Sequence, residues 1–387
     1  MSYHQRVAEP NLLKLLEFFS SVAVTGPRQS GKSSLIKHCL PDYRYVNFDY
    51  GDVRAQFYDD PRAFMRVNDN RVIFDEVQKV PEIFDYIKAS IDEDRDNPGK
   101  YVLSGSSQFN MMSSISESLA GRIGLLTLLP YQFSEVPDSL RLAMQYQGGY
   151  PELVNKAYRH SYEWFAAYLD TYLAKDVRDF GNVTDLNAFM RLIRLLAAQV
   201  GQQLNYTGLA SDLGLSVKTI EAWVGILQAS YIIYLLPPFY NNYGKRIIKA
   251  PKVYFYDVGL VSYLTGIETQ KQYANGPLAG HIFENYIVME VLKKQKHNNV
   301  YVDLYYLRDS NGVEVDLIID HKRYCEFIEI KKSETFYPRM AKNLKRFIEE
   351  NNKYIVLYCG ESGLPIDSKI KLKNYQDYLL ESISLPE

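Results

Sequence analysis

The chain has 387 residues, of which 47% are hydrophobic and 23% charged, so it can hold two or three domains with full cores and is not a disordered protein. Forty-four Lys and Arg against 46 Asp and Glu give a formal net charge of -2, which excludes attraction of nucleic acid by a global positive field. The isolated cysteines Cys39, Cys325 and Cys359 exclude a disulfide framework and a C-x-x-C zinc cluster, and they favour a reducing compartment.

The N-terminal segment does not resemble a secretion signal. Glu9, Lys14 and Glu17 interrupt its apolar residues. The most apolar later segment begins at Val224 and is too short and too interrupted to span a bilayer. We therefore expect a cytoplasmic protein that has no membrane partner.

The first strong motif is a glycine-rich turn between a predicted strand and a predicted helix. The sequence SVAVTGPRQSGKSSLIKHCL begins at Ser21 and contains G-x-x-x-x-G-K-S. Such a loop turns successive backbone N–H groups toward a phosphate, and the following helix adds the positive end of its dipole. The residues expected to bind the nucleotide are Gly26, Pro27, Arg28, Gln29, Ser30, Gly31, Lys32, Ser33 and Ser34.

The spacing assigns Lys32 to the β- and γ-phosphates and the Ser33 hydroxyl to Mg²⁺, so ATP and Mg²⁺ are the expected cofactors. The alternative is a turn that only joins a strand to a helix.

A partner strand should present an acid to the same metal ion. RVIFDEVQ, from Arg71, supplies Asp75 as a metal ligand and Glu76 as the residue that activates the attacking water.

Two further positions follow along the chain. KYVLSGSSQF, from Lys100, predicts a buried strand whose end places Ser106 or Ser107 at the γ-phosphate, assisted by Gln108, although a helix cap is the alternative. Arg122 is the only charge in its stretch and is a candidate arginine finger for a neighbouring subunit of a homo-oligomer. The alternative for Arg122 is a solvated side chain or an internal salt bridge.

The motifs GPRQSGKS, IFDEVQ, LSGSSQ, LAGR and GGYPE occur in an order that resembles a large family of prokaryotic AAA-type ATPases with a C-terminal domain of unknown function. YLDTYLAKDV and KVYFYDVGL extend the resemblance over nearly the whole chain. It implies an ATP-hydrolysing core, a winged-helix module and, in many members, a restriction-nuclease-like terminal fold. The sequence departs from better-understood AAA proteins in lacking a clear second-sensor Arg.

The middle of the chain predicts a helix-turn-helix with a wing. LNYTGLASDLGLSVKTIEAW, from Leu204, has helical spacing on both sides of LGLS, with Ser216 as the N-cap of the second helix. Lys218 and Thr219 would face DNA, but Glu221 would repel a phosphate backbone, so a structural or docking role is the alternative. A basic patch, or solvated charge, is predicted at Lys245, Arg246, Lys249 and Lys252.

The last domain places carboxylates within predicted strands. A helix is predicted over residues 281–294, strands over 301–309, 313–320, 325–332 and 353–358, and a helix over 337–350. This order matches the mixed core of PD-(D/E)XK nucleases. Asp316 and Glu329 are candidate metal ligands with Glu284 as an accessory acid, and Lys331 is a candidate catalytic residue. The alternative is an ion pair of Glu329 and Lys331 on a half-exposed sheet.

The sequence thus predicts an α/β protein in three parts: an AAA-type P-loop ATPase domain over residues 1–135, a helical and winged-helix connector over 136–274, and a restriction-endonuclease-like domain over 275–387. The leading hypothesis is a Mg²⁺-dependent ATPase coupled to a nuclease-like domain that acts on or binds nucleic acid. The alternative is an ATP-driven switch or scaffold whose C-terminal domain binds a partner without cleavage.

Overall fold

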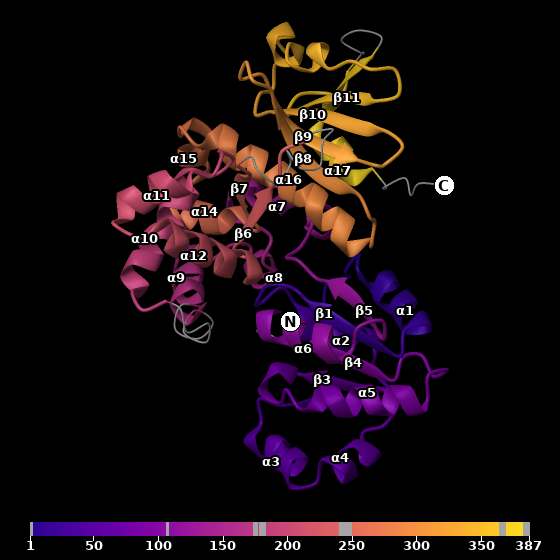
Figure 1. The fold of residues 1–387 in the computed structure, drawn as a ribbon. Coiled ribbons are helices and arrows are strands. Elements are labelled where there is room, and N and C mark those ends of the chain that lie inside the picture. Colours follow the sequence, from indigo (N-terminus) through magenta and orange to yellow (C-terminus); the bar gives the residue numbers. More distant parts are fainter. Residues whose placement is uncertain are drawn as a thin grey trace. The chain divides into compact units, whose positions relative to one another are not determined.

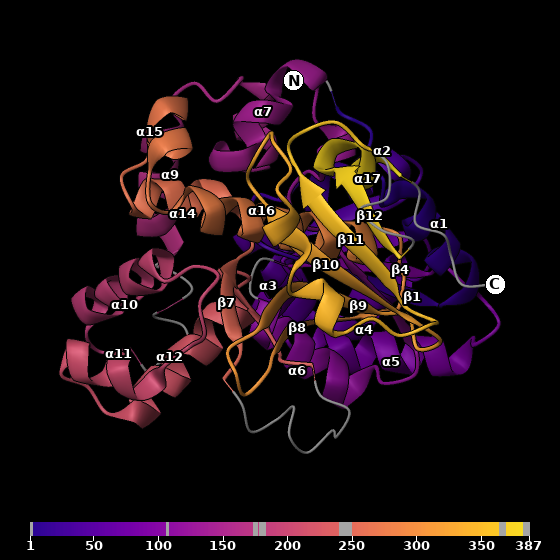
Figure 2. The ribbon, with the colours of Figure 1, turned by 90° about the horizontal axis from the view of Figure 1, so that it is seen from above.

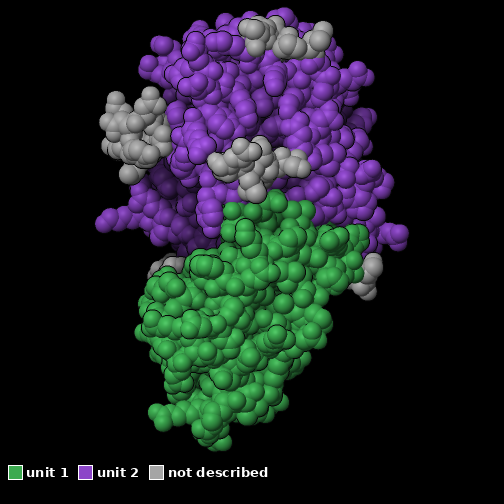
Figure 3. All heavy atoms as spheres, turned by 90° about the vertical axis from the view of Figure 1, so that its right-hand side faces the viewer, with its two compact units in different colours: residues 1–131, 150–152, 296–299 green, residues 132–149, 153–295, 300–387 purple. Residues whose placement is uncertain are grey.

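The computed structural model describes residues 3–105, 108–172, 177, 183–239, 250–363 and 369–381. Figure 1 and Figure 2 show the ribbon from two directions. The chain divides into two compact units, which Figure 3 draws in different colours. Unit 1 comprises residues 1–131, 150–152 and 296–299, and unit 2 comprises residues 132–149, 153–295 and 300–387.

The described part of unit 1 contains a sheet of five parallel strands in the order β2-β3-β4-β1-β5. Its strands are β1 (Ser21–Thr25), β2 (Arg44–Asn47), β3 (Val72–Asp75), β4 (Tyr101–Ser104) and β5 (Ile123–Thr127). Its helices are α1 (Glu9–Phe18), α2 (Lys32–Cys39), α3 (Gly51–Asp59), α4 (Pro61–Val67), α5 (Ile83–Glu93) and α6 (Gln108–Ser118). The strands predicted at 21–25 and 72–74 and the helix after the glycine-rich turn are therefore present.

Helices cover both faces of this sheet, as the continuous burial of β1, β3 and β4 requires. Side chains alternate between faces along a strand, so Val22 and Val24 pack with Leu12 of α1 and Leu35 of α2, whereas Ala23 belongs to the other core. That second core also contains Phe57, Met65, Ile87 and Ile115 of α3 to α6. Because all strands are parallel, the carboxyl ends of β1, β3 and β4 lie at one edge.

Unit 2 begins with helices and a small antiparallel sheet. Its helices up to residue 275 are α7 (Asp138–Gln147), α8 (Pro151–Asn155, which begins within the unit 1 segment 150–152), α9 (Ser161–Tyr172), α10 (Leu186–Ala198), α11 (Tyr206–Leu213), α12 (Val217–Ala229), α14 (Val258–Leu264) and α15 (Gln270–Asn275). Strands β6 (Ile233–Leu236) and β7 (Lys252–Phe255) pair antiparallel.

The helix pair that the sequence predicts is α11 and α12. The Ser216 hydroxyl caps α12 by accepting a hydrogen bond of 3.1 Å from the Thr219 N–H. The comparison with winged-helix proteins stays a prediction.

The second part of unit 2 is built on a mixed sheet in the order β12-β11-β10-β9-β8. Its strands are β8 (Asp303–Arg308), β9 (Glu314–Asp320), β10 (Cys325–Lys331), β11 (Lys353–Tyr358) and β12 (Ile370–Asn374), and its helices are α16 (Ala279–His297, whose last two residues belong to unit 1) and α17 (Tyr375–Leu380). Strands β8, β9 and β10 pair antiparallel, whereas β10, β11 and β12 pair parallel, and β11 and β12 run side by side in Figure 2.

One predicted element of this sheet domain is not formed. Instead of a helix over 337–350, the structure has two short 3₁₀ turns, at Pro338–Ala341 and Leu344–Arg346. The Tyr354 hydroxyl donates to the Phe347 carbonyl at 2.6 Å and accepts from the Glu349 N–H at 2.8 Å, so tertiary partners take backbone groups that a helix would use. Within the described ranges, no helix has the length and apolarity needed to cross a membrane.

Candidate functional site

The phosphate loop of unit 1 connects β1 to α2 and has the backbone shape that its glycines predict. Gly26 has φ +133°, and a Cβ at this position would lie 2.1 Å from the Leu128 carbonyl oxygen. Gly31 has φ +95° and occupies the N-cap position of α2. No side chain caps this helix, so the N–H groups of its first turn face the loop. Glycine is therefore required at both ends of the turn.

Lys32 lies at the C-terminal end of this loop, where α2 begins. Its side chain is buried, and Nζ donates to the carbonyl oxygens of Gly26 at 3.0 Å and Pro27 at 2.8 Å. Ser30 is completely buried, and its hydroxyl has no hydrogen-bond partner in the part of the chain that the structure describes. A buried ammonium group, a hydroxyl without a partner and a helix N-terminus together fit the binding of a phosphate group.

The Asp75 carboxylate lies at the centre of a polar cluster formed by three strand ends and α2. Ser33 Oγ donates to Asp75 Oδ2 at 2.9 Å, and the hydroxyls of Tyr45 and Ser104 also donate to this carboxylate. Burial and the hydrogen bond to Asp75 raise the pKa of Tyr45, which keeps the phenol protonated as a donor. The structure thus brings together Ser33 and Asp75, the two residues that the sequence predicts as ligands of one metal ion.

Glu76 follows Asp75 in an unusual backbone conformation. Its φ of 57° and ψ of 40° lie in the left-handed region, which costs a residue with a side chain about 1–2 kcal/mol. Its N–H donates to Asp75 Oδ1 at 3.1 Å, and the Gln78 amide donates to its carboxylate. Strain of this kind persists only where the surroundings fix it, and it is concentrated at functional sites. Glu76 therefore remains the candidate for activating water.

Sequence reasoning did not identify the residue that supports the loop from behind. Arg6 is 3% exposed, and its guanidinium donates to the carbonyls of Ser30 at 2.9 Å and Leu129 at 2.8 Å. It also lies 4.8 Å from the centre of the Tyr131 ring. No local pattern indicates this role, because Arg6 lies before the first helix and its partners are distant in sequence. Tyr45 and Ser104 were likewise missed as partners of Asp75.

Several predicted residues lie elsewhere or outside the described residues. Arg122 forms two hydrogen bonds with Asp92, of 2.9 and 3.0 Å, which lower the pKa of that carboxyl. It precedes β5, whereas Lys32 follows β1, so in a parallel sheet the two residues lie at opposite edges. This internal ion pair matches the alternative reading of Arg122, and self-association through it stays a prediction. Ser106, Ser107, the Gln108 side chain, Lys245, Arg246 and Lys249 lie outside the described residues.

The remaining loop residues of the prediction keep their expected places in the turn. Pro27, Arg28 and Gln29 lie between the two glycines, and Gln29 has a left-handed φ of 60°. Ser34 is exposed in the first turn of α2. Their contribution to binding stays a prediction.

The second cluster, in unit 2, joins Asp316 of β9 to Glu329 and Lys331 of β10. Lys331 Nζ lies 2.7 Å from Glu329 Oε1 and 3.2 Å from Asp316 Oδ2, and Asp316 Oδ2 also accepts from the Ile330 N–H at 2.7 Å. Residues two apart on a strand share a face, which is why Glu329 and Lys331 meet. Glu329 Oε2 is buried and has no hydrogen-bond partner among the described residues.

Glu284 of α16 is held by another set of partners. Lys252 Nζ donates to Glu284 Oε1 at 2.8 Å and pairs with Glu314 Oε1 at 2.5 Å, while the Tyr254 hydroxyl donates to Glu284 at 2.6 Å. Lys252 is 2% exposed, so it is an internal partner of carboxylates and not part of a solvated or nucleic-acid-facing patch. Among the described residues, no group of three or more His, Cys, Asp or Glu side chains is arranged to hold a metal ion. The ammonium groups of Lys252 and Lys331 instead neutralise these carboxylates.

Burial dominates the electrostatics of this cluster. It raises the pKa of Glu329 to about 8, with a further contribution from Asp316, and the pKa of Glu284 to about 7. The carboxylates in turn raise the pKa of Lys331 and Lys252 against the opposing effect of burial. These shifts favour a state in which the two lysines are charged and the cluster holds a proton at neutral pH.

This proton predicts a pH dependence of stability. A carboxyl whose folded pKa exceeds its ordinary value near 4.5 stabilises the fold below that value and loses its contribution as the pH rises through about 8. The unfolding free energy should therefore fall from about pH 5 to about pH 8 and level off at higher pH. Glu329→Gln, which cannot ionise, should flatten this fall in urea denaturation, whereas the exposed Glu350→Gln should not. Equal slopes for the wild type and Glu329→Gln would refute the assignment.

Family models match three successive parts of the chain. Residues 19–137 match an AAA domain, residues 141–271 match a domain of unknown function (DUF8612), and residues 279–378 match another domain of unknown function (DUF4143). The N-terminal region is therefore an AAA-type, ATPase-like domain, as its motifs predict. The descriptions of the other two families name no activity. The domain boundaries after residues 135 and 274 stay predictions.

Two curated proteins are similar over most of the chain. They are the uncharacterized proteins Mb2031c of Mycobacterium bovis and Rv2008c of Mycobacterium tuberculosis. Each is 25% identical over 374 residues, which cover 96% of this chain and 83% of the relative.

Among solved structures, the Walker-type ATPase PABY2304 of Pyrococcus abyssi has a TM-score of 0.46 at 14% identity, and the match covers 67% of this chain and 94% of that one. The RuvB Holliday junction branch migration motor of Thermotoga maritima has a TM-score of 0.31 at 14% identity, with 59% and 89% covered.

Proposed function

We propose that the AAA-type domain binds ATP with Mg²⁺ and hydrolyses it. The observation that best supports this function is the hydrogen bond of 2.9 Å between Ser33 and Asp75, directly beside the buried Lys32. A hydroxyl and a carboxylate are oxygen ligands of the kind that Mg²⁺ prefers, and a metal ion held with phosphates needs only one or two protein carboxylates. The residues present therefore fit the expected cofactor.

Each residue contributes a separate part of the proposed mechanism. The loop amides and Lys32 bind and orient the phosphates, and Ser33 and Asp75 would hold the metal ion. When bound, Mg²⁺ supplies charge neutralisation at the phosphates. Glu76 orients a water molecule and accepts its proton, and Gln78 fixes the position of the Glu76 carboxylate through its hydrogen bond. Tyr45 and Ser104 keep Asp75 in place.

The direct test is phosphate release by the purified full-length chain. Hydrolysis of ATP should require Mg²⁺ and should stop when EDTA removes it. Absence of hydrolysis together with absence of ATP binding would contradict the proposal.

A second candidate function belongs to unit 2: metal-dependent cleavage of nucleic acid. It is supported by the convergence of Asp316, Glu329 and Lys331 and by the buried Glu329 oxygen that has no partner among the described residues. Two carboxylates suffice for a Mg²⁺ ion that also contacts substrate phosphate. Asp316 and Glu329 would hold the ion, and Lys331, which is about one-third exposed, would contact the phosphodiester. Glu284 pairs with Lys252, and its part as an accessory acid of this set stays a prediction.

The cleavage assay uses Asp316→Asn as its variant. Wild-type protein should nick DNA or RNA in Mg²⁺ or Mn²⁺, and Asp316→Asn should reduce the rate about a hundredfold, because it removes one of the two carboxylate ligands. Glu350→Gln, an exposed substitution in the same unit, should cleave normally. If the wild type leaves both nucleic acids intact in both metals, the alternative of an ATP-driven switch that binds a partner without cleavage replaces this function.

A further inference from the structure

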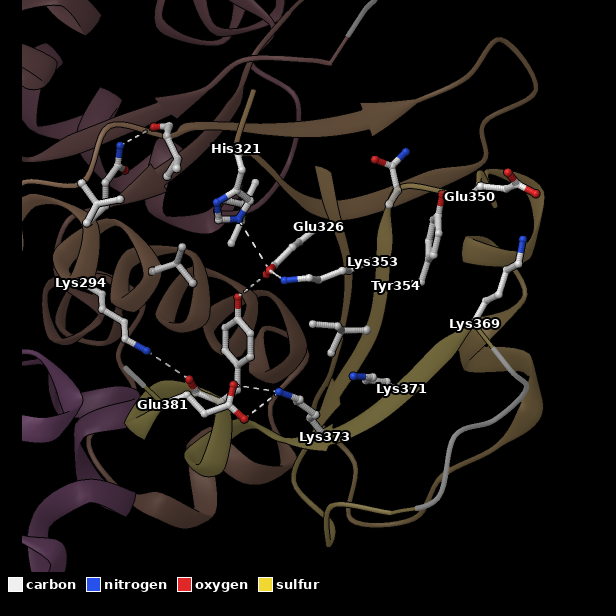
Figure 4. A pocket seen from close by; sticks show the side chains of 18 residues that line it. Lys294, His321, Glu326, Glu350, Lys353, Tyr354, Lys369, Lys371, Lys373 and Glu381 are labelled. Carbon is white, nitrogen blue, oxygen red and sulfur yellow. Dashed lines mark hydrogen bonds and ion pairs between the residues drawn. The ribbon is translucent and has the colours of Figure 1, made fainter. Parts of the chain in front are cut away.

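A cavity of about 440 Å³ lies within unit 2, between α16, α17 and the sheet strands β10, β11 and β12. We call it the lysine cavity, because Lys294, Lys353, Lys369, Lys371 and Lys373 line it (Figure 4). Its size falls within the usual range of small-molecule and cofactor sites. Neither the phosphate loop nor the Asp316 cluster uses any of these residues.

The lysine cavity lies on the opposite face of the sheet from the Asp316 cluster. Glu326 of β10 lines the cavity, and Glu329 is three residues further along the same strand. Because strand side chains alternate between faces, an odd separation places the two glutamates on opposite sides. The cavity is therefore a separate feature of the domain.

The described side chains that line the cavity carry an excess of positive charge, with five lysines against three glutamates. Two of those glutamates already have cationic partners, since Glu381 lies 2.7 Å from Lys373 and Glu326 lies 3.3 Å from Lys353. Lys371 is exposed and has no ion-pair or hydrogen-bond partner among the residues that the structure describes. An anion entering the cavity would thus meet a lysine that is available to bind it.

The amine of Lys294, on α16, is a second positive group of the cavity lining. Its Nζ donates to the Tyr378 carbonyl at 3.3 Å, and the side chain is only partly exposed. Burial lowers the pKa of Lys294, because the charged form loses its hydration. A bound anion would restore part of the interaction that burial removes.

The floor of the cavity is apolar and aromatic. Val302, Ile319 and Ile355 line it and are each less than 9% exposed. The Tyr378 ring also lines the cavity, with Lys294 Nζ 5.9 Å and Lys373 Nζ 5.8 Å from its centre. A flat apolar ring can lie on such a floor while a charged group reaches the lysines.

Two buried polar atoms of the cavity lining have no hydrogen-bond partner within the described chain. They are His321 Nε2, on a side chain that is 10% exposed, and Gln295 Oε1. The His321 ring stacks on Tyr324 with centroids 4.5 Å apart, and Nε2 lies 3.6 Å from Glu326 Oε1, which is too far for a hydrogen bond. Burial lowers the pKa of His321, which favours the neutral ring. Buried groups of this kind need hydrogen-bonding partners, and amino or hydroxyl groups of a ligand supply them.

We propose that the lysine cavity binds a nucleoside monophosphate. The base lies on the apolar floor of Ile319 and Ile355, and its amino group or the ribose hydroxyls reach Gln295 and His321. The phosphate lies at the rim and is bound by Lys371. This ligand has a flat ring for the apolar floor, hydrogen-bonding groups for the buried polar atoms and a compact anion for the lysines.

The test is calorimetric titration of AMP into the full-length chain carrying Lys32→Ala, which removes the main phosphate contact of the AAA-type domain. AMP should bind at one site, and inorganic phosphate should bind at least about tenfold more weakly. Adding Lys371→Ala should weaken AMP binding about tenfold, as the loss of one charged hydrogen bond implies. Lys342→Ala should leave AMP binding unchanged, because Lys342 is an exposed lysine directly after the 3₁₀ turn Pro338–Ala341 and does not line the cavity.

Three results would overturn the assignment. They are absence of AMP binding, equal affinities for AMP and inorganic phosphate, and an affinity that does not change in Lys371→Ala. Tighter binding of a short single-stranded oligonucleotide that displaces AMP would instead assign the cavity to a nucleic-acid strand. Because every titration is made on the Lys32→Ala background, these results are independent of whether the AAA-type domain hydrolyses ATP.

Discussion

The Lys32→Ala variant is expected to hydrolyse ATP with a kcat/KM at least about a hundredfold below that of the wild type. Lys32 is the buried cation of the phosphate loop, with Nζ 3.0 Å from the Gly26 carbonyl oxygen. In alanine no positive group can compensate the charge that develops on the phosphates. Phosphate release measured at saturating Mg²⁺ over a range of ATP concentrations gives kcat and KM separately.

Lys37→Ala is the matched control for this variant. Lys37 lies on the same helix, is exposed, and places Nζ 3.7 Å from the centre of the Tyr45 ring, away from the loop carbonyls. Its removal should change turnover by less than about threefold, because an exposed cation–π contact contributes only about 0.5–1 kcal/mol. Equal turnover of the wild type and Lys32→Ala would show that hydrolysis does not take place at this loop.

Glu76→Gln is expected to separate binding from chemistry. The amide cannot accept a proton from water, so kcat should fall roughly 10²–10⁴-fold. Affinity for ATP should stay within about threefold, because the phosphates are bound by the loop and by Lys32. Single-turnover hydrolysis and equilibrium binding of a fluorescent ATP analogue measure the two quantities independently.

Glu93→Gln provides the control for this second variant, since Glu93 is exposed at the end of α5. It should match the wild type in both measurements. A Glu76→Gln protein that turns over normally would remove Glu76 from the mechanism. A variant that loses ATP binding as well would instead assign Glu76 a role in shaping the loop, for which its left-handed φ of 57° provides a basis.

The phosphate loop could be predicted because its chemistry requires fixed residue types at fixed spacing. Gly26 and Gly31 have the positive φ values that the motif implies, and Lys32 and Ser33 follow at the start of α2. The neighbours of Asp75 could not be predicted in this way. Tyr45 and Ser104 reach Asp75 only because β3 lies between β2 and β4, and strand order is not a local property of the sequence.

The C-terminal region shows where local patterns fail. The segment 337–350 has helical spacing, but Tyr354 binds its backbone at Phe347 and Glu349, and only 3₁₀ turns form. Tertiary contacts thus overrode helix propensity. The short elements β12 and α17 were not predicted, although the alternation of Ile370, Lys371, Leu372 and Lys373 is a strand signal.

Lys252 illustrates a further limit of the sequence. Its neighbours in the chain include Lys245, Arg246 and Lys249, which favours a basic surface patch. In the fold it is 2% exposed and pairs with Glu284 and Glu314, which come from distant segments. A buried cation requires such partners, but which carboxylates provide them is decided by the packing of β7, α16 and β9.

The most direct test of the account is a crystal structure of the chain with Mn²⁺ and a non-hydrolysable ATP analogue. We predict electron density for a triphosphate over the amides between Gly26 and Ser33. An anomalous peak for the metal ion should lie between Ser33 and Asp75. A fully bound nucleotide elsewhere on the chain, or an ordered loop without nucleotide at saturating concentration, would contradict the proposal that this loop is an ATP site.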